Sequence, residues 1–177
     1  MTQFTIPEGA GDQILAYVRQ KSRDWTVAQM LDRVAGGLRD LEAVAREVPE
    51  AFLDLQPAGE EWTPRFCIQH VASINMGTAS RVASVAATGR QPREEPPGVP
   101  GGREEALALQ REVLERSFAA IAAAPEDAHL TATWLHPLLG ELTWREWLLT
   151  LRVHCLAHAG QLAAMAAALR AEGQGKE

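Results

Sequence analysis

Apolar residues recur at spacings of three and four through four long stretches, and this periodicity limits the fold more than any other feature. The clearest stretch is Thr26–Val48; its apolar positions are Val27, Met30, Leu31, Val34, Leu38, Leu41 and Val44. Other stretches span about 63–88, 103–124 and 144–171, and a shorter one covers Asp12–Arg23. Helices with one apolar face bury it against one another. We therefore predict an all-α, up-and-down four-helix bundle with a short extra N-terminal helix.

Capping and helix-breaking residues indicate where these helices begin and end. Pro49 ends the helix that starts near Thr26, because proline cannot continue a helix. Thr63 and Pro64 provide an N-cap and a first helical residue, and Gly89 is a suitable stop. The sequence Thr-Trp-Arg-Glu at 143–146 predicts a capping box at the start of the last helix.

The segments between the helices are predicted as loops. Residues 89–102 contain four prolines and four glycines, which no regular element tolerates. Residues 125–142 are expected to be irregular, and we expect no strand and no internal repeat anywhere. The length of 177 residues fits one domain over 1–177, with its core between about 12 and 171.

Composition excludes several classes of protein. Hydrophobic content is 46% and charged content 23%, as in ordinary soluble domains. The net charge is −6 with no run of Lys or Arg, so no nucleic-acid partner is expected. The longest apolar stretch, Leu162–Leu169, is too short to cross a membrane. Because Met1–Asp12 lacks the pattern of a signal peptide, we expect a cytoplasmic protein with reduced Cys67 and Cys155.

The most informative residues for function are His154 and His158, which lie four apart within the apolar stripe of the last helix. Their rings project from nearly the same direction, one turn apart, so that they can bind one metal ion. His70 lies on a separate predicted helix that could pack against this one. Three imidazoles would leave an open coordination position, as in catalytic metal sites. The alternative is three core histidines that each find their own hydrogen-bond partner.

The residues around the pair narrow the chemistry. Cys155, Leu156 and Ala157 separate the two histidines, so the pattern is not HExxH and a zincin protease is excluded. No Asp or Glu lies within one turn on the same helix; Asp32 and Glu42 are candidate outer carboxylates from another helix. Imidazole suits several divalent metals, and zinc is our first choice with nickel second.

Other candidates carry two interpretations each. His136 either lines the mouth of the site or is a turn residue, and Cys67, one turn before His70, either approaches the metal or packs in the core. Arg81 either neutralises an acidic substrate or is solvated. We interpret His129 as a solvated loop residue and Cys155 as a core filler. For the tryptophans near the last helix, core packing is favoured over stacking on a substrate; they are Trp134, Trp144 and Trp147.

The order of these motifs resembles the DinB-like (DinB/YfiT) superfamily of damage-inducible proteins and metal-dependent thiol S-transferases. In that family a Trp-Thr pair opens a helix and a His follows; here these are Trp62, Thr63 and His70. The final helix carries His, three residues, His, then Gln and an apolar residue, matched by His154, His158, Gln161 and Leu162. The resemblance extends from about Asp12 to Arg170 and includes His136-Pro137, Gly140 and Thr143.

The resemblance implies that His70, His154 and His158 bind a metal at the centre of a four-helix bundle. It further implies a thiol S-transferase in which the metal activates a thiol of the bacillithiol or mycothiol type toward an electrophile. It is also consistent with a homodimer. The alternatives are a non-catalytic metal-binding stress-response module and a metal-dependent hydrolase. No catalytic residue is assigned from the sequence.

Overall fold

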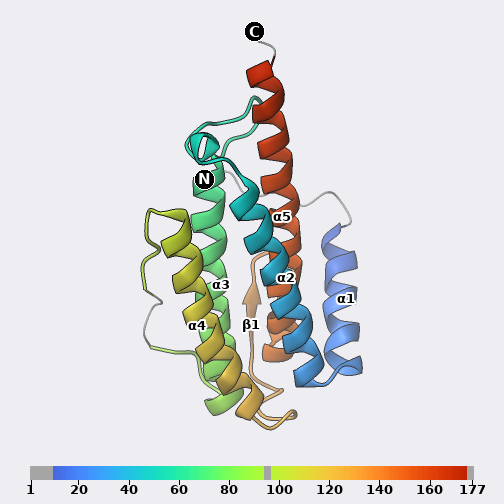
Figure 1. Cartoon of the computed structure of the whole chain (residues 1–177). Helices are drawn as coiled ribbons and strands as arrows, with labels where there is room; N and C mark the ends of the chain where they lie inside the picture. Colours follow the sequence, from blue (N-terminus) through green and yellow to red (C-terminus); the bar gives the residue numbers. More distant parts are fainter. Residues whose placement is uncertain (1–9, 94–96, 175–177) are drawn as a thin grey trace.

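The computed structural model describes residues 10–93 and 97–174 (Figure 1). Its elements are α1 (Ala10–Asp24), α2 (Val27–Glu47), a 3-10 turn (Glu50–Phe52), α3 (Pro64–Thr88), α4 (Arg103–Ala123), β1 (Thr133–His136), β2 (Gly140–Thr143) and α5 (Trp144–Gln174). Helices α2, α3, α4 and α5 form the bundle, and α1 packs against α5. The predicted all-α four-helix bundle with an extra N-terminal helix is therefore confirmed.

The directions of the helices differ from the predicted up-and-down order, in which each helix runs antiparallel to the one before it. In Figure 1, α2 and α5 run one way along the bundle, and α3 and α4 run the other way. The contacts agree, because Arg65 on the first turn of α3 bonds to the carbonyl of Gly101, just before α4, while Asn75 further along bonds to Gln110. The connection between α3 and α4 thus returns the chain along the bundle, so these neighbours are parallel.

Two of the predicted helix starts and one predicted stop are made by the expected residues. Thr63 Oγ1 accepts from the backbone N–H of Phe66 at 3.2 Å, and Gly89 closes α3 with φ of 71°, a conformation that suits glycine. At α5 the backbone N–H of Thr143 donates to Glu146 Oε2 at 2.8 Å, and the N–H of Glu146 donates to Thr143 Oγ1 at 3.4 Å. The predicted capping box is formed.

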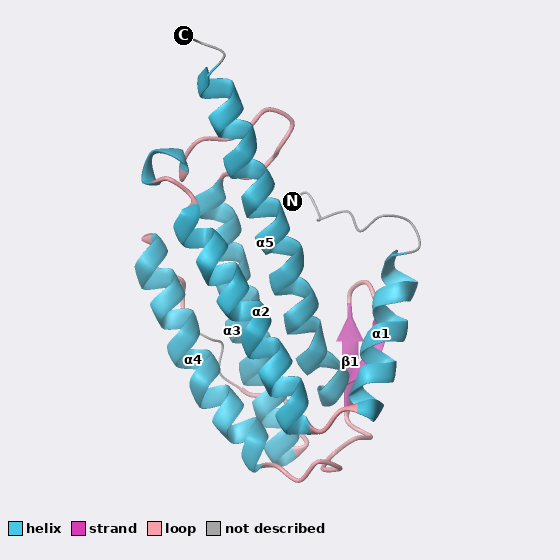
Figure 2. Cartoon of the chain, turned by 45° about the vertical axis from the view of Figure 1, so that its right-hand side comes forward, coloured by secondary structure: helices cyan, strands magenta, loops and turns pink. Residues whose placement is uncertain are grey.

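The expectation that residues 125–142 contain no strand was wrong. Strands β1 and β2 pair as an antiparallel hairpin from Thr133↔Thr143 to His136↔Gly140 and lie beside the lower part of α5 (Figure 2). Each strand has four residues, too few for a clear alternation in the sequence. Burial of Trp134 and Leu142 against the core, rather than intrinsic strand preference, stabilises the hairpin.

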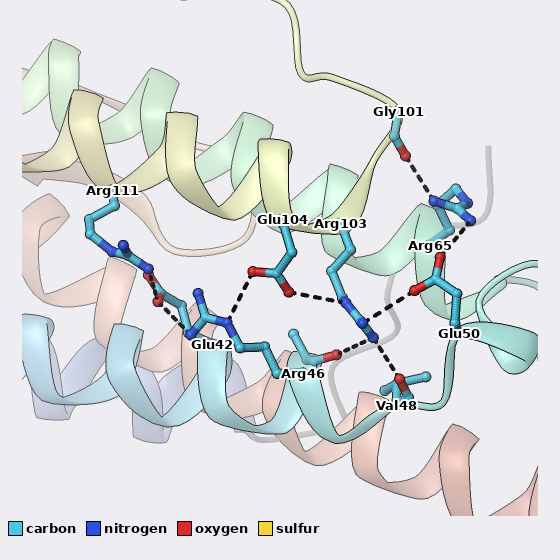
Figure 3. Close-up of polar contacts among 10 residues, drawn as sticks. Glu42, Arg46, Val48, Glu50, Arg65, Gly101, Arg103, Glu104 and Arg111 are labelled. Carbon is cyan, nitrogen blue, oxygen red and sulfur yellow. Dashed lines mark hydrogen bonds and ion pairs between the residues drawn. The ribbon is translucent and has the colours of Figure 1, made fainter.

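Ion pairs and backbone hydrogen bonds close the end of the bundle where α2 ends and α4 begins (Figure 3). Arg103 Nη1 donates to the carbonyl of Val48 at 2.6 Å, just beyond α2, and Arg103 Nη2 lies 3.2 Å from Glu50 Oε2. A cation near a helix C-terminus also stabilises the helix by interacting with its dipole. These contacts hold α2 and α4 at the end where α3 begins, and so help to position the first turns of α3.

The core is one continuous cluster of buried apolar side chains from the helices and the hairpin. In α2 it includes five of the predicted inward residues: Val27, Met30, Val34, Leu38 and Leu41. None of the helices in the described part of the chain is both long and apolar enough to cross a membrane.

Candidate metal centre

The structure brings together the three histidines that the sequence singled out. His70 comes from α3, and His154 and His158 come from α5, which packs antiparallel to it. Each offers a ring nitrogen, and these atoms lie within 4.8 Å of one another. The ring centroids are 4.5 Å apart for His154 and His158, 5.3 Å for His70 and His158, and 5.6 Å for His70 and His154. We call these residues the three-histidine cluster.

His154 is oriented by an amide side chain inside the bundle. Its Nδ1 lies 3.0 Å from Asn75 Oδ1, and Asn75 is fully buried. Asn75 Nδ2 in turn donates to Gln110 Oε1 at 3.0 Å and to Cys155 Sγ at 3.4 Å. Because an amide oxygen only accepts, the proton of a neutral His154 ring lies on Nδ1. The lone pair is then on Nε2, the nitrogen that remains for a metal ion.

His158 has the same arrangement with a different partner. Its Nδ1 lies 2.8 Å from Gln161 Oε1, and Gln161 Nε2 donates to Glu60 Oε2 at 3.5 Å. The amide oxygen again places the ring proton on Nδ1 and the lone pair on Nε2. Such outer hydrogen bonds are typical of metal-binding histidines, because they set the tautomer and hold the ring in place.

The environment keeps the three imidazoles neutral. Burial, followed by the nearby His158, His70 and His136, lowers the pKa of His154 to about 3. Burial and His158 lower the pKa of His70, and burial lowers the pKa of His158. Neutral imidazole is the form that binds metals, so the cluster needs no deprotonation before binding at neutral pH.

Cys67 lies beside the cluster but outside it. Its Sγ is 3.7 Å from His158 Nδ1 and 3.7 Å from Gln161 Oε1, on the side of the His158 ring that carries the proton. Burial, with a further contribution from Glu60, raises the pKa of the Cys67 thiol to about 12. Among the described residues, the group able to hold a metal contains the three histidines and not Cys67. The core interpretation of Cys67 therefore fits better than the ligand interpretation.

Trp62 packs against two of the three rings. It stacks on His158 with centroids 5.8 Å apart and an interplanar angle of 12°, and it lies 4.7 Å from His70. Phe66 meets the edge of Trp62 at 5.0 Å and is 50% exposed. Ile74, one turn after His70 on α3, is 45% exposed. His70 therefore lies at the edge of the packed face of α3, with exposed apolar residues one turn before and after it.

The tryptophans near α5, Cys155 and His129 lie where the sequence predicted. Trp144 is fully buried and donates from Nε1 to the carbonyl of Ala128 at 2.7 Å. Trp134 and Trp147 stack on each other at 5.2 Å, so core packing accounts for all three tryptophans. Cys155 is fully buried, as expected of a core filler, and His129 is exposed.

Arg81 is half-buried on α3 and makes no hydrogen bond or ion pair to the residues the structure describes. The two suggested outer carboxylates were wrong. Asp32 is exposed, and Glu42 pairs with Arg46 and Arg111 rather than with a histidine of the cluster (Figure 3).

Sequence reasoning missed three residues that surround the cluster. Glu60, from the connection before α3, is the carboxylate that reaches Gln161. Asn75 and Gln110 form the buried amide pair behind His154. One signal was available, because Asn75 interrupts the apolar face of α3 five residues after His70, and a buried amide needs a specific partner.

Comparison with known proteins identifies the family. Residues 30–162, which include all three histidines, match the DinB superfamily. The chain belongs to the DinB superfamily. The predicted resemblance is thereby confirmed, and α1 lies outside the matched region.

Solved structures that are similar to this DinB protein include the following two. One is the four-helix bundle protein TT2238, at 27% identity and a TM-score of 0.61, covering 78% of this chain and 99% of that one. The other is a mutant of a mycothiol-dependent maleylpyruvate isomerase, at 20% identity and a TM-score of 0.59. The similarity to the isomerase covers 80% of this chain but only 62% of the isomerase, so it shows the fold alone. A search of curated proteins finds no match.

Proposed function

We propose that this DinB protein binds one divalent metal ion through His70, His154 and His158 and is a metal-dependent thiol S-transferase. The observation that carries the proposal is the convergence of three neutral imidazoles from two helices, with ligand atoms within 4.8 Å of one another. Neutral imidazole nitrogen is a common ligand of divalent metals, so a divalent cation fits such a cluster.

The surrounding residues would prepare the site for this chemistry. Asn75 and Gln161 hold the rings of His154 and His158 in the tautomer that presents Nε2. When bound, the metal supplies Lewis acidity that lowers the pKa of a coordinated thiol, so that the thiol is ionised at neutral pH. Trp62 covers one side of the cluster, and Phe66 and Ile74 expose apolar surface one turn before and one turn after His70.

Ligand chemistry and the family support a choice of metal and of substrate class. Zinc is the first choice and nickel the second, because both accept imidazole nitrogen. A low-molecular-weight thiol is the proposed cosubstrate, and an electrophile accepts it. The similar isomerase is described as mycothiol-dependent, which supports the thiol class without fixing the thiol. A homodimer remains a prediction.

The first test is metal content. Untagged protein is loaded with Zn²⁺ or Ni²⁺, desalted and analysed by mass spectrometry, for the wild type, for His158→Ala and for His129→Asn as an exposed-histidine control. We expect about one metal per chain in the wild type and the control, and less than about a tenth of that in His158→Ala. Equal metal content in all three proteins would contradict the proposed metal site.

The second test is thiol transfer. Metal-loaded protein is mixed with bacillithiol, mycothiol or glutathione and monochlorobimane, and the fluorescent product is followed with and without a chelator. A rate above the uncatalysed reaction that disappears with the chelator supports the transferase. No metal-dependent rate with any of these thiols would contradict it.

A second candidate is a non-catalytic metal-binding module. One observation favours it: the metal-compatible group among the described residues contains no carboxylate to serve as a general base. Glu60, the nearby carboxylate, is bonded to Gln161 instead. The same feature weakens the case for a metal-dependent hydrolase. Bound metal without transfer or hydrolysis would select the module.

A further inference from the structure

Two chains of side-chain hydrogen bonds end on the histidines of α5, and they differ in their outer members. His158 Nδ1 lies 2.8 Å from Gln161 Oε1, and Gln161 Nε2 donates to Glu60 Oε2 at 3.5 Å. At neutral pH a carboxylate only accepts hydrogen bonds, so Glu60 fixes which end of the Gln161 amide faces the ring. The chain at His154 contains no carboxylate, so its direction depends on neutral groups.

The chain at His154 runs through two amides in the interior of the bundle. His154 Nδ1 lies 3.0 Å from Asn75 Oδ1. Asn75 Nδ2 donates to Gln110 Oε1 at 3.0 Å and to Cys155 Sγ at 3.4 Å. Asn75 is fully buried and Gln110 is only 1% exposed, so both amides are shielded from solvent. Gln110 Oε1 is the outermost acceptor, and each hydrogen bond of the chain points away from the cluster.

The direction matters because the same two amides could be hydrogen-bonded the other way round. If both turned over, Gln110 would donate to Asn75, and Asn75 would donate to Nδ1 of His154. The proton of the neutral ring would then lie on Nε2, the nitrogen needed for a metal, where another imidazole of the cluster could accept it. A metal ion binds that nitrogen only after the proton has moved. The acceptor oxygen of Gln110 therefore bears on whether His154 is ready for a metal.

The amide of Gln110 is destabilising at its other end. Its Nε2 is buried and has no hydrogen-bond partner among residues 10–93 and 97–174. A buried donor without a partner costs about 1–3 kcal/mol of stability. An apolar residue of similar size would avoid this cost, so stability does not account for an amide here. The oxygen that accepts from Asn75 does account for it.

We infer that Gln110 is a positioning residue for metal binding, because its oxygen holds Asn75 in the orientation that keeps the His154 proton on Nδ1 and leaves Nε2 for the ion. The inference rests on the metal-binding part of the proposed function. It adds a residue of α4, a helix that carries no histidine of the cluster. Gln110 reaches His154 through Asn75, so its effect on metal affinity requires that amide.

The first experiment measures the Zn²⁺ affinity of the full chain by competition with a chromophoric chelator. Gln110→Met removes the oxygen at similar size, and we expect the affinity to fall by roughly 10-fold, the lower end of the range for outer partners of metal ligands. Gln110→Glu keeps an acceptor toward Asn75 and should stay within about three-fold of the wild type. An unchanged affinity in Gln110→Met, or an equal loss in Gln110→Glu, would overturn the inference.

The control and a double-mutant cycle separate this role from packing. Ser117→Ala is the control, because Ser117 is a buried polar residue of the same helix that bonds to the carbonyl of Val113. In the Asn75→Ala background, Gln110→Met should change the Zn²⁺ affinity by less than about two-fold, because the amide through which Gln110 acts is gone. A purely structural role predicts the same loss in both backgrounds, and that result would also overturn the inference.

The tautomer of His154 is a second readout, taken without metal. In the ¹⁵N spectrum of the metal-free wild type, the His154 proton should lie on Nδ1, with the signal assigned by its loss in His154→Ala. His136 is an internal reference with its proton on Nε2, because its Nδ1 accepts from the backbone N–H groups of Leu138 and Leu139 at 3.1 and 3.2 Å. A His154 proton on Nε2 would overturn the inference. Wild-type protein that binds no Zn²⁺ would instead reject the proposed metal site, which keeps the two failures distinct.

Discussion

Arg145 and the histidine pair of α5 are largely buried polar groups that differ in how their polar atoms are bonded. At the first turn of α5, Arg145 is only 9% exposed and donates to three backbone carbonyls: Nε to Ser22 at 2.9 Å, Nη1 to Glu126 at 2.9 Å, and Nη2 to Trp25 at 2.6 Å. These acceptors lie at the end of α1, at the turn before α2 and after α4. Arg145 therefore ties the end of α1, the turn before α2 and the segment after α4 to α5.

Farther along the same helix, His154 and His158 use Nδ1 in hydrogen bonds to amide side chains and keep their other nitrogen toward His70. Three neutral imidazoles from two helices converge there. Neutral imidazole is the form that binds metals, so this convergence indicates a ligand, whereas donors bonded to backbone carbonyls indicate a structural role. The contrast predicts that changes at Arg145 affect folding and that changes around the histidines affect metal binding.

The largest expected effect on stability comes from Arg145→Met. The substitution leaves three carbonyls without their donor, and we expect a loss of about 2–4 kcal/mol in the free energy of unfolding. Urea denaturation of the metal-free protein measures it, with the exposed Arg116→Met as the matched control. Metal affinity per folded molecule should stay unchanged. A large loss of metal affinity without a loss in the free energy of unfolding would contradict the structural role of Arg145.

Asn75→Ala tests the other region. Removing the amide frees the ring of His154 from its fixed orientation, and we expect metal affinity to fall by roughly 10- to 100-fold. Competition with a chromophoric chelator measures this affinity. Ser117→Ala is the control, because Ser117 is also buried but bonds to the carbonyl of Val113 in its own helix. Equal affinities in the two variants would show that Asn75 serves packing alone.

The smallest effect concerns pH and the metal-free protein. The folded protein lowers the pKa of His154 to about 3, so the unfolded chain binds a proton at higher pH than the folded one. The stability contribution is complete above about pH 6.5 and is lost as pH falls toward the folded value, by about 1 kcal/mol between pH 6.5 and 5.5. Denaturation at several pH values should show this slope, reduced in His154→Ala and unchanged in Arg145→Met. A slope that persists in His154→Ala would assign it to other groups.

Much of the fold followed from local signals. As expected, α3 begins with Thr63 as N-cap and Pro64 as first residue and ends at Gly89, and the Thr143–Glu146 capping box starts α5. The hairpin did not follow, because strands of four residues depend on burial of Trp134 and Leu142 against the bundle. The parallel arrangement of α3 and α4 could not be predicted either. The sequence of the loop between them does not show that it runs back along the bundle before α4 begins.

The sequence by itself determined the helices, the family and the three histidines, because periodicity, capping and motif spacing are properties of the chain. Only the tertiary structure decided which polar groups complete the site. Glu60, Asn75 and Gln110 are far from His154 and His158 in sequence, and helix packing alone brings them within hydrogen-bond reach of the cluster or of its partners. Hydrogen bonds require a separation of about 3 Å, and residues this distant in sequence reach it only in the folded chain.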